Sequence, residues 1–159
     1  MKLIITEKQL KLIIESEKEG KLMHIPTEIL QDKESFDRVF NLYKDNKEKK
    51  NYIGIKVVGD IDLSGRYGMG FGSNMVGFCE ELIEVDGELR VVGNYIVSFP
   101  KLKRVDGDMK LSMTEVYELP ELIYVGGDLY LINSPLSKTT TEEELRNKIN
   151  VGGEIYLWK

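Results

Sequence analysis

The chain has 159 residues, of which 42% are hydrophobic and 31% charged, a composition typical of one soluble domain that buries its own core. Its apolar runs stay well short of the roughly 18 residues that a membrane span needs, and its single cysteine excludes an internal disulfide framework. Residues 1–50 carry eleven basic and ten acidic side chains, whereas residues 51–159 carry eleven and seventeen, a net charge of −6. Because an acidic surface disfavours phosphate backbones, we expect no nucleic-acid partner, and the short apolar runs argue against a membrane partner.

The first predicted helix begins near the N-terminus. Thr6 and Gln9 have the spacing of a capping box, Ile5 and Leu10 that of a hydrophobic staple, and Gly20 stands where a C-cap belongs. The apolar start of the chain passes directly into this polar segment, so no secretory signal peptide is visible.

A second helix is predicted further along the N-terminal region. A short helical turn is expected at residues 27–30, and the longer helix is expected to start after Ser35, because four apolar residues follow with helical spacing: Phe36, Val39, Phe40 and Tyr43. We therefore divide the chain into an N-terminal helical region, residues 1–50, and a second region, residues 51–159.

A seven-residue unit occurs five times in the second region. It consists of a valine, a variable residue, a glycine, an acid, and two apolar residues that flank a variable one. The copies read VVGDIDL, VDGELRV, VDGDMKL, VGGDLYL and VGGEIYL, and begin at Val57, Val85, Val105, Val125 and Val151, in steps of 28, 20, 20 and 26 residues. The longer steps contain insertions at residues 65–73 and 137–148. In the second insertion, Thr141 and Glu144 have capping-box spacing and predict a short helix.

Stacked repeats of this length predict a short parallel β-solenoid of about five coils, with one parallel strand in each coil and an N-terminal helical cap, an α+β fold. One coil cannot bury its apolar side alone, so the valines and the two later apolar positions of each repeat should form three buried columns. The repeated glycines suit a corner that needs either a positive φ or close backbone approach. Parallel pairing should follow the 20-residue step.

Two segments carry a resemblance to known repeats. LPELIYVGGDLYLINSPL and FPKLKRVDGDMKLSMTEV resemble the leucine-rich-like repeats of receptor L-domains and of similar tailed-phage proteins, and the opening MKLIITEKQLKLIIE is similar to the start of many small phage proteins. The first resemblance covers residues 57–159 and implies a parallel β-solenoid used for protein recognition. It departs from ordinary leucine-rich repeats in having few coils and no asparagine ladder. A cytoplasmic or virion-associated protein is expected.

The candidates for chemistry are few. The GMGFG segment lacks the Lys-Ser/Thr that a phosphate loop requires, so the first insertion is either a contact loop presenting Tyr67 and Phe71 or a passive extension. Cys79 takes the place that Phe99 and Leu119 hold in later repeats, which marks it as a core residue rather than the partner of His24, the single histidine. No nucleophile, acid and base converge. We therefore predict a protein that is not an enzyme, with no catalytic residue, cofactor or metal assigned.

One acid recurs in every repeat, and the five would form a ladder of like charges: Asp60, Glu88, Asp108, Asp128 and Glu154. Neighbouring strands lie roughly 4.8 Å apart, so something must offset the repulsion. Either each carboxylate accepts hydrogen bonds from turn amides or is well solvated at the corner of its coil, or the ladder binds a cation such as calcium.

The variable strand positions should point outward, and their character changes along the stack. The early coils present Asp62, Arg90 and Lys110, whereas the last two present an aromatic and aliphatic group: Tyr124, Tyr130, Ile132, Tyr156 and Trp158. Aromatic side chains are enriched at binding hot spots. The alternative is that an N-terminal helix covers them.

The sequence thus predicts a non-catalytic protein-binding or structural module. The partner is expected to be a protein or a second copy, docked through the last coil, whose final strand has no following segment to cover it. A repeat-fold inhibitor or modulator of a host protein is the alternative that the sequence does not separate from this.

Overall fold

In the computed structural model, each seven-residue repeat makes two short strands separated by a corner, where the sequence predicted one strand per coil. The first of each pair contains the repeat valine, and these strands are β2 (Gly54–Val58), β4 (Leu82–Val85), β6 (Arg104–Val105), β8 (Tyr124–Val125) and β10 (Asn150–Val151). The second follows the glycine and the acid, giving β3 (Ile61–Asp62), β5 (Leu89–Arg90), β7 (Met109–Lys110), β9 (Leu129–Tyr130) and β11 (Ile155–Tyr156). The glycine corner interrupts the strand, so one repeat serves two sheets.

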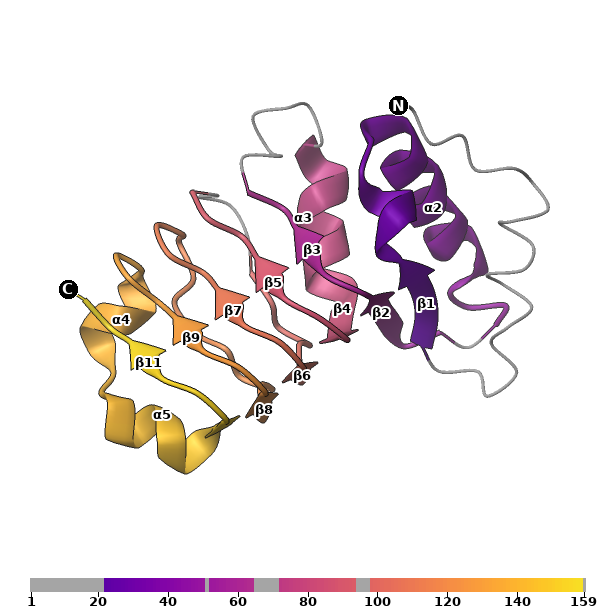
Figure 1. The fold of residues 1–159 in the computed structure, drawn as a ribbon. Coiled ribbons are helices and arrows are strands. Elements are labelled where there is room, and N and C mark those ends of the chain that lie inside the picture. The colour runs from indigo at the N-terminus through magenta and orange to yellow at the C-terminus, as the bar shows by residue number, and fades with distance from the viewer. Residues whose placement is uncertain (1–21, 51, 65–71, 94–97, 159) are drawn as a thin grey trace.

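The paired strands form two parallel sheets (Figure 1). The first sheet has six strands in the order β1-β2-β4-β6-β8-β10, and the second has five in the order β3-β5-β7-β9-β11. Val85 pairs with Val105 and Val105 with Val125, which confirms parallel pairing at the 20-residue step. Residues one repeat apart therefore lie side by side on the same face.

The structure describes residues 22–50, 52–64, 72–93 and 98–158. The helix predicted near Thr6 and most of the Gly-rich insertion, including Tyr67 and Phe71, lie outside these residues. The described chain is α+β, with helices α2 (Lys33–Asn46), α3 (Gly72–Glu81), α4 (Pro135–Thr139) and α5 (Glu142–Lys148) and a 3₁₀ helix η1 (Thr27–Leu30).

The caps explain where these helices begin. Helix α2 starts at Lys33 rather than after Ser35, because the Asp32 carboxylate accepts a hydrogen bond from the Ser35 amide at 3.0 Å and is the N-cap. The predicted Thr141 capping box is confirmed: the Glu144 amide donates to the Thr141 hydroxyl, and the Glu144 carboxylate accepts from the Thr141 amide at 2.8 Å. The turn at residues 27–30 is also confirmed, whereas α3 and α4 were not predicted.

Strand β1 (Leu22–Pro26) is a further element that was not predicted. It pairs in parallel with β2, with Ile25 opposite Val57, so the N-terminal region contributes the first strand of the first sheet. Met23 and Ile25 are buried and His24 is exposed, which is the alternation of a half-buried strand.

The three predicted columns lie in the core. The valine column and the next one are buried throughout. In the third column Leu157 is partly buried against the core, and the other members are fully buried: Leu63, Val91, Leu111 and Leu131. Cys79, Phe99 and Leu119 are also buried, as their shared place in the repeat indicated.

Glu81, at the end of α3, connects α2 to the repeat region. Its carboxylate accepts a 2.5 Å hydrogen bond from the Tyr43 hydroxyl and pairs with Lys47 and Lys101, each at 3.0 Å. Burial alone would raise the pKa of the Glu81 carboxyl, but the hydrogen bonds from Tyr43, Lys101 and Lys47 outweigh it, so the pKa lies below its usual value of 4.5. The ionised form is therefore stabilised by folding.

Replacing Leu111 with Asp should prevent folding, because it leaves an unpaired charge in the middle of a buried column. The expected loss exceeds about 4 kcal/mol, a large part of the stability of a small domain. Ser112→Asp, at the half-buried next position, is the matched control and should remain folded in circular dichroism. A Leu111→Asp variant with unchanged thermal melting would refute the column.

Glu81→Gln should lower the free energy of unfolding by roughly 1–2 kcal/mol at pH 7. Because the folded pKa is lowered, the stabilisation is present above pH 4.5 and is lost as the pH falls through the folded pKa. Urea titrations of the two proteins should therefore converge in acid. Glu80→Gln, at the exposed neighbouring position, should match the wild type at every pH.

Candidate functional site

The acids of the ladder are placed at the corner between the two sheets. The Asp60 carboxylate accepts a hydrogen bond from the Glu88 amide at 2.7 Å, Asp108 from the Asp128 amide at 2.9 Å, and Asp128 from the Glu154 amide at 2.8 Å. Each aspartate thus bonds to the backbone of the following repeat, which confirms the prediction of corner amides for these three. Glu88 instead pairs with Lys110 at 2.9 Å.

The repeated glycines make room for these carboxylates. A Cβ atom on Gly87, Gly127 or Gly153 would lie far inside van der Waals contact with the carboxylate oxygen of the aspartate one repeat earlier. A Cβ atom on Gly107, in the repeat after that of Glu88, would instead meet backbone atoms, the nearest at 2.8 Å. Of the five repeat glycines, Gly59 has a positive φ of 113°. Close approach is therefore what requires glycine at the later corners.

The geometry of the ladder gives little support to a cation site. One oxygen of Asp60, Asp108 and Asp128 already accepts an amide hydrogen bond. Within the described residues, no three His, Cys, Asp or Glu side chains are grouped closely enough to hold a metal ion.

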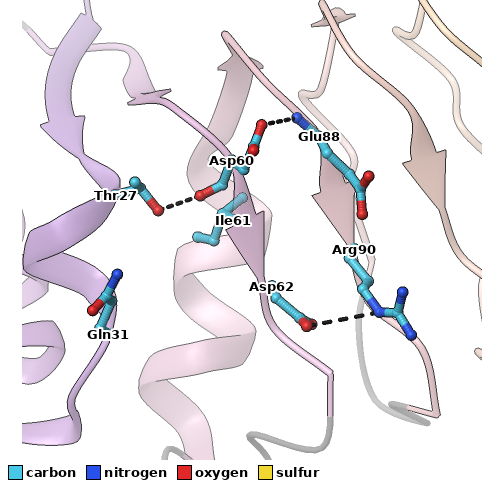
Figure 2. A pocket seen from close by; sticks show the side chains of 7 residues that line it. All are labelled: Thr27, Gln31, Asp60, Ile61, Asp62, Glu88 and Arg90. Carbon is cyan, nitrogen blue, oxygen red and sulfur yellow. Dashed lines mark hydrogen bonds and ion pairs between the residues drawn. The ribbon is translucent and has the colours of Figure 1, made fainter.

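A polar pocket of about 290 Å³ lies where η1 meets the first two repeats (Figure 2). Seven residues line it: Thr27, Gln31, Asp60, Ile61, Asp62, Glu88 and Arg90. The Thr27 hydroxyl donates to the backbone carbonyl of Asp60, so it is not directed at a base. Sequence reasoning missed this pocket, because nothing local to residues 27–31 indicates which repeat they face.

The two residues weighed for nucleophilic catalysis are in unlike environments. Cys79 is fully buried, and desolvation, with the nearby Glu80 charge, raises the pKa of its thiol well above the usual value. His24 is exposed on β1. A neutral, enclosed thiol is poorly suited to act as a nucleophile.

The outward positions of the second sheet form one continuous row, here called the outer row. Its members, in register from β3 to β11, are Asp62, Arg90, Lys110, Tyr130 and Tyr156. The Arg90 Nε atom lies 3.7 Å from the Asp62 Oδ2 atom, and the Lys110 ammonium lies 5.6 Å from the centre of the Tyr130 ring. The Tyr130 and Tyr156 rings stack at 4.5 Å with an interplanar angle of 8°. The row therefore runs from charged to aromatic.

Tyr130 is held in this stack by its hydroxyl, which donates to the Asp128 carboxylate at 3.1 Å. Partial desolvation, and then the hydrogen bond and charge of Asp128, raise the pKa of Tyr130 to about 12. The phenol is therefore neutral throughout the physiological range, and it presents an amphipathic surface.

The predicted aromatic group is divided between the two sheets. Tyr124 lies in β8 of the first sheet, where the Arg104 guanidinium stacks over its ring at 4.2 Å. Tyr130 and Tyr156 lie in the second sheet, with half-buried Ile132 and with Trp158, which is 70% exposed, shortly after them. The corner between Val125 and Leu129 separates the two parts, which a single-strand interpretation of the repeat did not anticipate.

Among the described helices, α2 contacts η1 and α3, and α5 contacts β10. The aromatic end of the outer row lies at the opposite end of the sheets from α2 (Figure 1). The N-terminal segment that was considered as a cover lies outside the described residues.

A search of protein-family models, curated proteins and solved structures gives no match. None of the helices in the described part of the chain has the length and apolar character to cross a bilayer.

The coupling between aspartate and glycine can be measured in a double-mutant cycle. Gly127→Ala should destabilise the wild type by about 2 kcal/mol or more, and by about 1 kcal/mol less when Asp108 is also Ala, because the clashing carboxylate is gone. Gly107→Ala with Glu88→Ala is the control, and should show no such coupling, since backbone atoms obstruct that position. Urea denaturation gives the four free energies in each cycle, and equal coupling in both would contradict the assignment.

Proposed function

We propose that the chain is a non-catalytic, protein-binding module built as a leucine-rich-like solenoid. Each repeat adds one strand to each sheet with the repeat valines in register, and the buried columns continue from repeat to repeat, as such an architecture requires. Residues 51–159 would form the solenoid, and the helices of residues 1–50 would cap its front.

The observation that carries the binding role is the aromatic end of the outer row. Two stacked tyrosines lie on the consecutive strands β9 and β11, and half-buried Ile132 and the largely exposed Trp158 follow them in the chain. Large amphipathic side chains on a rigid backbone lose little conformational freedom on binding, which is why they dominate interface hot spots. A protein surface is the partner that this chemistry favours.

A non-catalytic role agrees with the candidate residues. The Cys79 thiol is enclosed, and the Thr27 hydroxyl of the pocket is committed to a carbonyl. The resemblance of the opening residues to phage proteins makes a virion component the first partner to test. An inhibitor or modulator of a host protein would use the same surface.

A double replacement of Tyr156 and Trp158 by Ser should abolish partner capture while leaving the fold intact. The control is Tyr117→Ser, which removes a tyrosine that is 67% exposed but lies outside the outer row. The wild type and the control should retain the same proteins from an extract of the source cells or from purified virions, and the double variant should not. Retention of those proteins by the folded double variant would refute this surface as the binding site.

A further inference from the structure

We infer that the partner of the outer row is a second copy of this chain, docked face to face across a two-fold axis that lies in the interface, parallel to the strands of the second sheet. This rests on the proposed binding role and names its partner.

The first argument is the polarity of the row. Arg90 and Lys110 occupy neighbouring positions in β5 and β7, and Tyr130 and Tyr156 occupy the next two, in β9 and β11. A two-fold axis in the interface, parallel to the strands, turns the second copy over onto the first and reverses the direction of its row. With the axis between Lys110 and Tyr130, Arg90 meets the partner's Tyr156, and Lys110 meets the partner's Tyr130.

Cation–tyrosine pairing already occurs within the chain. Arg104 stacks on Tyr124 at 4.2 Å in the first sheet, and Lys110 approaches Tyr130 at 5.6 Å in the second. Both pairs join neighbouring repeats, which shows that the chemistry fits the spacing between adjacent strands. A guanidinium over an aromatic face is the more frequent form of this contact in proteins.

Availability selects Arg90 as the principal cation. Its side chain is 45% exposed, and its ion pair with Asp62 is long at 3.7 Å. Lys110 is engaged by Glu88 at 2.9 Å and Asp108 at 3.7 Å. The alternative alignment, with both rows in the same direction, would set cation against cation and is disfavoured.

The reversed row also places an apolar contact beside the charged one. Trp158 of each copy falls opposite the partner's Val92, since both lie two positions after the outer-row residue of their strand. The contact is self-complementary: each copy supplies both halves, and the contact occurs twice in the dimer.

The size of the surface sets the expected affinity. Five strands at about 4.8 Å span roughly 20 Å, which is a small interface, so the dimer should be weak and dependent on concentration. Each copy carries a net charge of −5, and at 0.15 M salt, where the Debye length is about 8 Å, the general repulsion between the copies is largely screened.

The test uses two variants of the full chain and their mixture in sedimentation velocity. Arg90→Glu and Tyr156→Lys should each weaken self-association by roughly tenfold or more, because they give Glu–Tyr and Arg–Lys contacts. The equimolar mixture should regain association, since one of its two contacts becomes Glu–Lys and the other remains Arg–Tyr. Tyr117→Ser should associate like the wild type.

Three results would overturn the inference: a wild type that is monomeric at about 1 mM, variants that associate like the wild type, or a mixture that does not recover. Thermal melting confirms the fold of each protein, and Arg90→Gln and Tyr156→Leu replace any variant that fails to fold. A monomeric wild type that still captures another protein through Tyr156 and Trp158 would leave the proposed binding role standing. A wild type that neither self-associates nor captures another protein through these residues would refute the surface as a binding site.

Discussion

The structure depends on one contact that recurs at the corner between the sheets, where an aspartate of one repeat bonds to the backbone amide of the next. The carboxylate oxygens of Asp60, Asp108 and Asp128 stand where a side chain on the following glycine would be. The contact fixes the register of both sheets together, because each corner joins a strand of the first sheet to a strand of the second. The hydrogen bonds from the amides also offset part of the repulsion between the carboxylates along the ladder.

A fixed register turns the variable positions into ordered surface rows. Side chains that are 20 residues apart in sequence become neighbours, so the outer row can change from ionic to aromatic without changing its backbone. Stacking of Tyr130 on Tyr156 at 4.5 Å follows directly from the spacing of adjacent strands. The core and the surface are thus specified by alternate residues of the same two-residue strands.

The sequence predicts the elements whose signals are local or periodic. The valine step predicts the pairing of Val85, Val105 and Val125, and the Thr141 capping box predicts α5. Strand β1 was missed because five residues ending in proline carry only a weak alternation, and its place is decided by long-range pairing with β2. The second strand of each repeat was missed because it has two residues, which are too few to show an alternation of their own, so the repeat reads as one continuous strand. For the same reason, Tyr124 was grouped with Tyr130, although the corner assigns them to different sheets.

The step from Val85 to Val125 contains no insertion, and each repeat meets the next through identical hydrogen bonds at the first strand and the corner glycine. A duplication of 20 residues within this stretch would therefore create a complete rung in both sheets without disturbing its neighbours. The length of the outer row is then an evolutionary variable that is separable from folding. Related chains could widen or narrow the same recognition face by whole repeats, while longer insertions vary the loops that connect them.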